Sequence, residues 1–461
     1  MAGLWTRERV LSLAPDAASA SAGAGLAGAQ KWKTLGRSDA AIWGELQGSG
    51  AKPYQTRVDL SEPAFKCSCP SRKFPCKHAL GLMLIYAADE SALKPGSPPG
   101  WVGEWLADRQ TRSEKKAEKV AAAAEPPAPR DEAAAARRIA AREAKVAAGL
   151  DELSLWMEDL VRSGFGAAQT QPAPFWEKMA ARLVDAQAPG LARRVRELAT
   201  IAFSGEGWQR RLLVAVGRLA LLVAAYRRSN DLPDDLVADV RGEVGWTRSQ
   251  DELLAQPGLR DIWCVVGQRL MQEEQLRIKR TWLIGEQSGR WALILHFAAG
   301  PQPMDTSLQV GSRFDDELVF YPSAVPLRAL RKELSAPHRR IAAGNLPLGL
   351  SMGEGLKVAA GTLARNPWIE RWPLLLRDVV IAPAAAEPGV SCVARDSEGH
   401  ILRIRSHESQ AWQLVAISGG RPLTLFGEWD GESLSPFSAA TRDRFFTFVP
   451  QESGPILVRV A

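Results

Sequence analysis

Four sulfur and nitrogen donors lie within twelve residues near the start of the chain. The segment reads Cys-Ser-Cys-Pro-Ser-Arg-Lys-Phe-Pro-Cys-Lys-His, and its donors are Cys67, Cys69, Cys76 and His78. Thiolates and a neutral imidazole are the ligands that Zn²⁺ prefers, and four of them complete a tetrahedron with no position left for water or substrate. We therefore predict one structural zinc ion here, which fixes the local fold and does not catalyse a reaction.

A chance cluster of buried cysteines, a disulfide and a redox pair are the alternatives. The chain has five cysteines, and an odd number argues against complete disulfide pairing. The first residues lack the apolar stretch of a secretion signal, and the best membrane candidate, 212–226, is too short and carries Arg218. We therefore expect a cytoplasmic protein with no membrane partner. In a reducing compartment, clustered cysteines favour metal binding over disulfides.

The spacing of the donors sets a geometric condition. In an extended strand, Cys67 and Cys69 would point to opposite faces, so both can reach one ion only if the chain turns sharply. Pro70-Ser71 is suitable for such a turn. Two positions on a helix also diverge, so we expect Cys76 at the cap or first turn of a helix and His78 just after it. A thiolate at that end gains from the positive pole of the helix dipole.

The motif Cys-x-Cys, six residues, Cys-x-His resembles the SWIM-type zinc finger. An alternating strand pattern at 53–60 and a short strand at 64–67 precede it, and an apolar helix pattern at 79–87 follows. The sequence from residue 48 to residue 78 is similar to the bacterial branch of that family, and the resemblance covers about residues 50–85. It implies a structural zinc module that binds DNA or other proteins.

Bacterial proteins that resemble this segment accompany MoxR-type AAA+ ATPases and von Willebrand A-domain proteins. The resemblance therefore implies a protein-interaction adaptor in such a system, with an AAA+ ATPase or a von Willebrand A-domain protein as its partner. The large share of the chain without recognisable chemistry favours the same interpretation.

DNA binding is the alternative function. The stretch from Lys66 to His78 contains Lys66, Arg72, Lys73 and Lys77 and no Asp or Glu. The whole chain has a formal charge of +6 and a pI of about 9.1, which is compatible with a nucleic-acid partner. In this hypothesis the four basic side chains contact DNA phosphates.

A chain of 461 residues exceeds the size of one compact core. We predict a multidomain α+β protein with a small N-terminal ββα zinc-finger domain, a central α-helical bundle and a β-rich C-terminal domain. The predicted domains are the zinc-finger domain (1–110), an Ala/Lys/Glu/Pro-rich linker (111–136), the α-helical domain (137–280) and the β-rich domain (281–461). The linker has almost no large apolar side chain and cannot bury enough surface to order itself.

Periodicity predicts the individual elements. The expected helices are 7–13, 101–109, 175–186, 191–203, 207–228 and 259–276, with one further helix at 327–334 inside the β-rich domain. The expected strands of that domain include 291–297, 399–405 and 413–418.

The remaining cysteines and histidines form no second motif. Cys264 and Cys392 are isolated, and the spacing of the other four histidines is unlike a metal site. No Gly-rich loop that would hold phosphates is present. We therefore expect no catalytic residues, no bound cofactor besides zinc, and no enzymatic activity. A site assembled from distant residues of the C-terminal region is the hypothesis that these patterns leave open.

Overall fold

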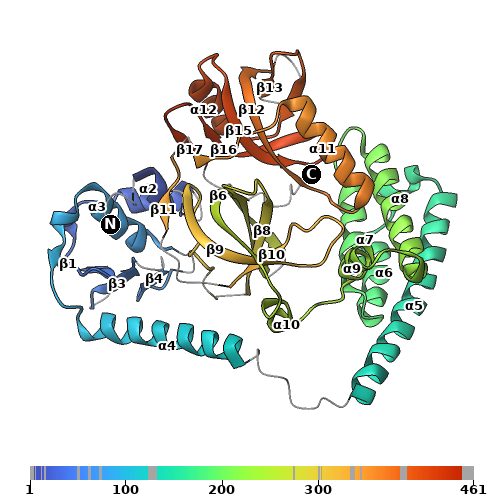
Figure 1. Ribbon diagram of the computed structural model, residues 1–461, viewed down its shortest axis with the longest axis horizontal. Helices are drawn as coiled ribbons and strands as arrows, with labels where there is room; N and C mark the ends of the chain where they lie inside the picture. The colour runs from blue at the N-terminus through green and yellow to red at the C-terminus, as the bar shows by residue number, and fades with distance from the viewer. Residues whose placement is uncertain are drawn as a thin grey trace.

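The computed structural model places three units along the chain: an N-terminal unit with a small sheet, a bundle of helices, and a C-terminal part with two larger sheets (Figure 1). The structure describes residues 5, 7–11, 13–14, 17–48, 52–60, 64–71, 75–122, 132–273, 276–299, 302, 304–332, 338–342, 345–384 and 392–448. None of the described helices combines the length and the apolar character that crossing a membrane requires.

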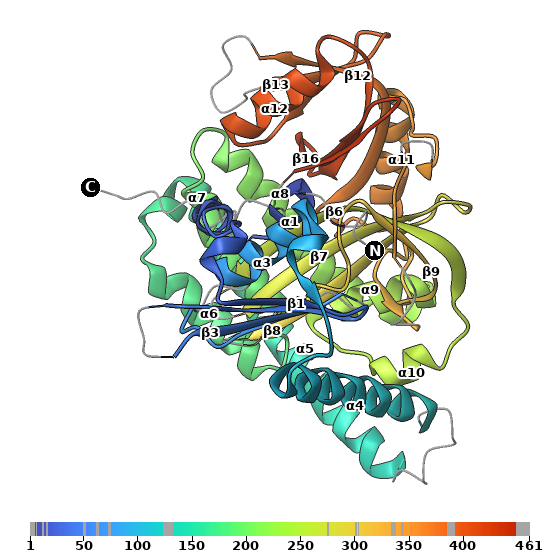
Figure 2. The ribbon, with the colours of Figure 1, turned by 90° about the vertical axis from the view of Figure 1, so that its left-hand side faces the viewer.

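The N-terminal unit is a five-stranded sheet with helices on both faces (Figure 2). The strand order is β4-β3-β2-β1-β5. The strands are β1 (Thr34–Arg37), β2 (Ala41–Leu46), β3 (Tyr54–Asp59), β4 (Ala64–Cys67) and β5 (Lys94–Pro95). The helices are α1 (Arg7–Leu11), α2 (Ala17–Ala24), α3 (Lys77–Ala88) and α4 (Gly100–Ala122). The predicted ββα unit is present as β3, β4 and α3, inside a sheet larger than expected.

Helix α3 is apolar nearly all round because it is enclosed on all sides. Its residues from His78 to Tyr86 are all buried, between the sheet and α2. Glycines let the two helices approach closely: a Cβ on Gly23 would lie 2.6 Å from Leu80 Cβ, and one on Gly81 would lie 2.8 Å from Leu26 Cβ. The small residues of α2 therefore serve close packing.

The opposite face of the sheet packs on α4. Trp43 and Ala41 of β2 contact Val102 there. The helix extends past the predicted 101–109 to Ala122, so its second half occupies part of the predicted linker. The middle of that linker, residues 123–131, lies outside the described residues.

The bundle follows the helical spacing of its apolar residues. It contains α5 (Glu132–Arg162), α6 (Ala173–Asp185), α7 (Pro189–Ala202), α8 (Trp208–Arg227) and α9 (Asp234–Val244), followed by the short α10 (Gln250–Leu254). Leu150, Leu153, Met157 and Leu160 of α5 are all buried in its core. The helices predicted at 175–186, 191–203 and 207–228 are confirmed as α6, α7 and α8.

The helix predicted at 259–276 is wrong, because Leu259–Glu273 forms the long strand β6. Its centre, 263–266, is fully buried in the sheet and reads as a continuous apolar run. Periodicity alone cannot separate such a run from a buried helix, and the adjacent Val265 and Val266 favour the strand. The change from helices to strands therefore falls near residue 258 and not at 281.

Strand β6 is central in the first C-terminal sheet, of order β10-β9-β6-β7-β8, with β11 also paired to β9. The other strands are β7 (Leu276–Gly285), β8 (Trp291–Ala299), β9 (Ser312–Phe320), β10 (Ala329–Arg331) and β11 (Arg339–Arg340). The predicted strand at 291–297 is confirmed as β8. The helix predicted at 327–334 is wrong, since β10 lies there and residues 333–337 are outside the described part.

The second sheet has the order β14-β13-β12-β15-β16-β17. Its strands are β12 (Trp372–Pro383), β13 (Cys392–Arg395), β14 (Ile401–Ile404), β15 (Leu423–Trp429), β16 (Ser433–Ala440) and β17 (Phe445–Thr447), and its helices are α11 (Met352–Arg365) and α12 (Glu408–Ser418). The predicted strand at 399–405 is confirmed as β14. The predicted strand at 413–418 is wrong, because this segment is the second half of α12.

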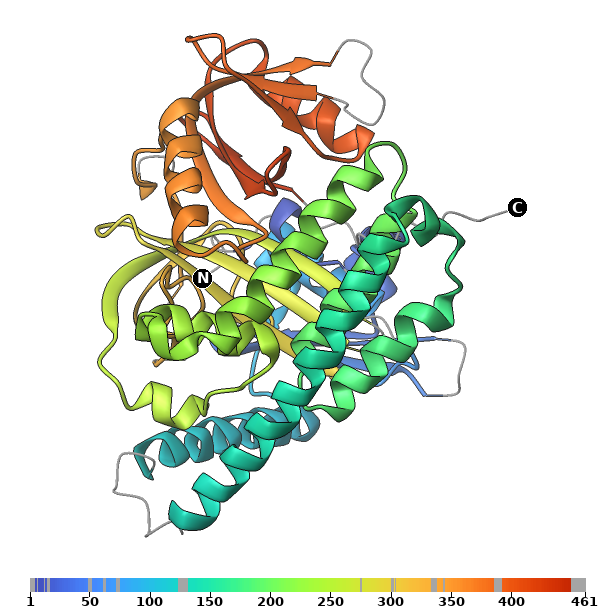
Figure 3. The same ribbon diagram turned by 90° about the vertical axis from the view of Figure 1, so that its right-hand side faces the viewer.

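The bundle packs directly against the C-terminal part (Figure 3). Trp368 lies in the core of the bundle, and its indole Nε1 donates a hydrogen bond of 3.1 Å to the carbonyl oxygen of Arg218 on α8. Arg194 of α7 forms an ion pair of 2.9 Å with Glu370, two residues further on. These contacts fix α7 and α8 beside the loop that leads into β12.

Candidate metal centre

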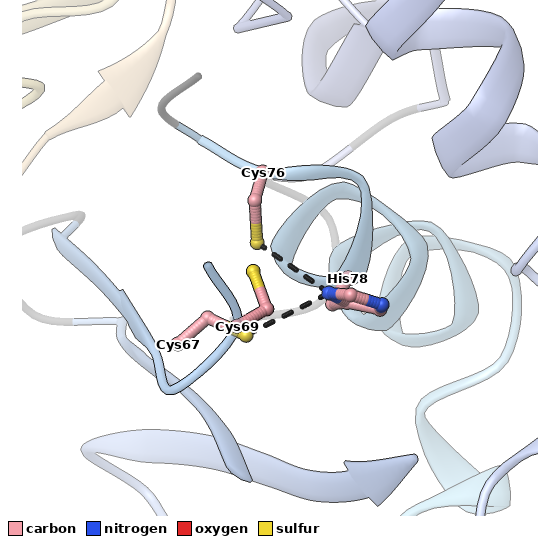
Figure 4. A group of neighbouring side chains, drawn as sticks. All are labelled: Cys67, Cys69, Cys76 and His78. Carbon is pink, nitrogen blue, oxygen red and sulfur yellow. Dashed lines mark hydrogen bonds between the residues drawn. The ribbon is translucent and has the colours of Figure 1, made fainter. Parts of the chain in front are cut away.

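The four predicted ligands come from three adjoining pieces of the N-terminal unit (Figure 4). Cys67 is the last residue of β4, and Cys69 follows where the chain leaves the sheet. Cys76 is the N-cap residue of α3, and His78 is the second residue of that helix. The positions predicted for Cys76 and His78 are therefore confirmed, and the hairpin of β3 and β4 carries the first two ligands to the helix.

The four donor atoms converge. All lie within 4.8 Å of one another. Cys67 Sγ lies 3.7 Å from His78 Nδ1, and Cys76 Sγ lies 3.9 Å from the same nitrogen. A tetrahedral zinc ion with Zn–S of about 2.3 Å and Zn–N of about 2.0 Å separates sulfur and nitrogen by about 3.5 Å. The donor set and its spacing therefore fit zinc, with His78 binding through Nδ1.

The electrostatics of the cluster also suit a cation. Burial lowers the pKa of His78, but the nearby sulfurs of Cys67 and Cys69 outweigh it and raise that pKa to about 9. Hydrogen bonding with Cys67 lowers the pKa of Cys69. Hydrogen bonds with Cys67 and Cys69, together with burial, raise the pKa of Cys76. The Cys69 thiol therefore loses its proton easily, while the Cys76 thiol keeps its proton until a metal ion displaces it.

Two residues of β3 support the ligands. The Thr56 side chain is buried directly across the ladder from Cys67, and its Oγ1 lies 3.2 Å from the Cys67 sulfur, where a hydroxyl can donate to a thiolate. The ring of Tyr54 lies 5.1 Å from the imidazole of His78. Such neighbours orient metal ligands and exclude water from them. The sequence analysis missed both residues, although their place in the strand opposite Cys67 could have indicated them.

The basic residues proposed to contact DNA are only partly accounted for. Lys66 of β4 and Lys77 of α3 are exposed. Arg72 and Lys73 lie outside the described residues. The DNA contacts predicted for all four therefore remain a prediction.

The other two cysteines are structural. Cys264 in β6 and Cys392 in β13 are fully buried in the two C-terminal sheets. Burial raises the pKa of Cys264 to about 12 and that of Cys392 to about 11, which keeps both thiols protonated. They are small apolar core residues in this fold.

A second group of possible metal donors lies in the turn before β14. It consists of Asp396, Glu398 and His400, and His400 Nδ1 lies 2.8 Å from Asp396 Oδ2. Glu398 and His400 are exposed, and a hydrogen-bonded turn explains the arrangement without an ion.

Two family models match separate segments of the chain. Residues 57–87 match the SWIM zinc finger, a segment that runs from within β3 to α3 and contains all four ligands. Residues 141–244 match the SWIM-associated four-helix bundle domain, which corresponds to most of α5 and continues to the end of α9. No curated protein and no solved structure matches.

The chain thus contains a SWIM zinc finger at residues 57–87 and the helical bundle associated with such fingers at residues 141–244. Cys67, Cys69, Cys76 and His78 form the cluster that supports one structural zinc ion.

Proposed function

We propose that this protein is a non-catalytic adaptor that binds other proteins and depends on zinc for its shape. SWIM zinc fingers mediate protein or DNA interactions. The observation that carries the proposal is the closed metal site: four protein donors surround one point, which leaves no coordination position for a substrate. The zinc ion then acts by holding β4 and α3 together.

Helix α8 of the bundle supports a protein partner. Leu213 is 58% exposed and Leu221 is 47% exposed, and Gly217 lies between them on the same face of the helix. Exposed apolar side chains at this spacing suit a partner helix, which would bury them. The bundle would then supply the docking surface, and the zinc-finger unit a second contact.

The partner we propose is a MoxR-type AAA+ ATPase or a von Willebrand A-domain protein. This choice rests on the resemblance of the zinc-finger segment to bacterial proteins that accompany such ATPases and von Willebrand A-domain proteins. The test is co-purification with the tagged full-length chain, followed by calorimetry with the purified partner.

The decisive variant combines Leu213→Ser and Leu221→Ser. Burying one leucine contributes about 1.5 to 3 kcal/mol, so losing two should weaken binding at least about tenfold. The control combines Ile139→Ser and Leu155→Ser, two apolar residues of α5 that are 52% and 64% exposed. A chain that recovers no partner and remains a solitary monomer would overturn the proposal.

DNA binding by the zinc finger is the second candidate, supported by the exposure of Lys66 and Lys77 close to the ligands. Each phosphate contact adds about 0.9 to the slope of log K against log salt on duplex DNA. Lys66→Ala with Lys77→Ala should therefore reduce that slope by about 1.8. The exposed Lys145 and Lys178 of the bundle provide the control pair. An unchanged slope would exclude these two contacts.

A further inference from the structure

A cavity of about 650 Å³ lies where the bundle meets the C-terminal part. Residues of α7 and α8 form one wall, and Met271 of β6, Arg371 and Arg405 form the other. The contacts of Trp368 and Arg194 described above hold the two walls together. The volume falls within the range of about 300 to 1,000 Å³ that is usual for small-ligand sites.

The cavity is lined by seven arginines and four carboxylates. Arg210 and Arg218 have no ion-pair partner among the residues that the structure describes. Within the described part of the chain, Arg211 donates to neutral groups alone, including Ser204 Oγ at 2.9 Å. Arg211 and Arg218 lie two helical turns apart, on the same side of α8. One wall therefore presents positive charge that no described carboxylate neutralises.

The opposite wall carries charges of both signs. Arg371 and Arg405 lie there together with Glu370, Asp430 and Glu432, and Arg405 forms an ion pair of 2.7 Å with Asp430. Arg371 shares a single, fully buried carboxylate, that of Glu428, with Arg269 and Arg280. The guanidinium nitrogens lie 3.1 to 3.6 Å from its oxygens. Burial lowers the pKa of Arg269; the Glu428 carboxylate raises it, and the neighbouring arginines lower it again. A single carboxylate pairs with three guanidinium groups, so a further anion beside Arg371 would stabilise these three arginines.

Arg194 of α7 lines the cavity and has a buried nitrogen without a partner in the described structure. Arg194 is 9% exposed, and although its two terminal nitrogens bind Glu243 and Glu370, its buried Nε has no hydrogen-bond partner within the described part of the chain. The Nε atom is enclosed by protein, and the two ion pairs hold the Arg194 side chain in the wall of the cavity.

We infer that this cavity binds a small organic anion that carries two or more phosphate groups. Guanidinium groups bind phosphate oxygens in a bidentate manner, and several of them in one cavity require several negative charges on the ligand. Leu198, Ile201 and Met271 offer an apolar surface for the organic part. The four carboxylates at the cavity, among them Asp430 and Glu432, would repel a long polyanion, which disfavours DNA and acidic polypeptides. This site is distinct from the zinc centre and from the proposed adaptor surface.

The test uses the zinc-loaded full-length chain and calorimetry with four probes: inorganic tripolyphosphate, ATP, citrate and a 20-nucleotide DNA. The decisive variant combines Arg211→Gln and Arg218→Gln. Its control combines Arg227→Gln and Arg228→Gln, which remove the same charge from the other end of α8, outside the cavity. Thermal unfolding and zinc content verify that each variant is folded.

The expected result is saturable binding of ATP and tripolyphosphate at one site per chain, weakened at least about tenfold in the decisive variant and unchanged in the control. Absence of saturable binding for both phosphate probes would overturn the inference. So would tighter binding of citrate than of tripolyphosphate, an equal loss in the control, or a preference of the same arginines for a 20-nucleotide DNA. Failure of the adaptor test would leave these results unaffected, so the two proposals can fail separately.

Discussion

The zinc-binding unit and the C-terminal sheets bury polar groups by opposite means. In the first, four donors within twelve residues surround a point that a metal ion occupies. In the second, Glu428 binds Arg280 from 148 residues away, and Asp316 binds the buried Arg331 across neighbouring strands. The first arrangement needs an external ion, but a short segment of the chain supplies all of its ligands. The second needs no ion, but it exists only once distant strands have paired.

The largest effect is expected from removing one zinc ligand. Cys76→Ser replaces a thiolate by a hydroxyl but places a favourable residue at the N-cap of α3, where the native side chain makes no capping hydrogen bond. Loss of stability then reports the metal and not the helix cap. Structural zinc contributes about 10 to 16 kcal/mol in zinc-finger peptides.

We expect zinc to be lost and amide protection to fall over β4 and α3, while β6 and β15 keep their protection. Zinc analysis and hydrogen exchange by mass spectrometry measure both. Stoichiometric zinc with unchanged exchange would show that Cys76 is not a ligand.

The next effect tests the interface between the two C-terminal sheets. Phe426 is almost completely buried, stacks on Trp291 at 5.2 Å and contacts Phe437. Phe426→Ala leaves a cavity and should lower the free energy of unfolding of this part by about 3 to 5 kcal/mol. Guanidinium unfolding measures the loss. The zinc content should stay at the wild-type level, and a loss of zinc would show that the two regions are not independent.

The stability that Glu428 contributes to the C-terminal part should depend on pH. Burial would raise its pKa, but its three arginine neighbours lower it below the ordinary value of 4.5. Its carboxylate therefore stabilises the fold above pH 4.5, and that contribution is lost as the pH falls through the lowered value. Glu428→Gln leaves the arginines without their anion and should cost about 3 kcal/mol at pH 7.

The difference between wild type and Glu428→Gln should shrink as the pH falls below 4.5. Unfolding curves at pH 7 and below pH 4.5 measure it, with the exposed Glu354→Gln as a control of small effect. A difference that is the same at both pH values would mean that the Glu428 carboxylate does not carry this stability.

The smallest effect separates the two kinds of cysteine. Cys392 is as buried as Cys76, but it lies in β13 with no other sulfur or imidazole donor near it in the described structure. Cys392→Ala should cost about 1 kcal/mol and leave zinc bound. A drop in zinc content would assign Cys392 a role that its position in the fold does not support.

The same contrast explains which parts of the fold the sequence predicts. The zinc site was predictable because Cys67, Cys69, Cys76 and His78 are neighbours in sequence, and a tetrahedral site restricts their geometry. The helices α6 to α8 were predictable from periodicity. The strand β6 was not, because its buried apolar run looks the same in a strand and in a helix, and only its pairing with β7 and β9 decides between them.

Helix α12 is the opposite error, because a segment predicted as a strand is part of a helix. The segment Gln413-Leu-Val-Ala-Ile-Ser has the β-branched residues of a strand, yet it is helical, with Leu414 buried against β12. Tertiary packing overrides weak local preference there. The cluster around Glu428 was invisible for a related reason: its members come from β6, β7, β15 and the loop before β12, and nothing local connects them.

The most direct test of the zinc centre is X-ray absorption at the zinc edge, combined with elemental analysis of the purified full-length chain. We predict one zinc ion per chain, bound by three sulfurs at about 2.3 Å and one nitrogen at about 2.0 Å. Absence of stoichiometric zinc, or an oxygen from water among its ligands, would contradict a closed structural site.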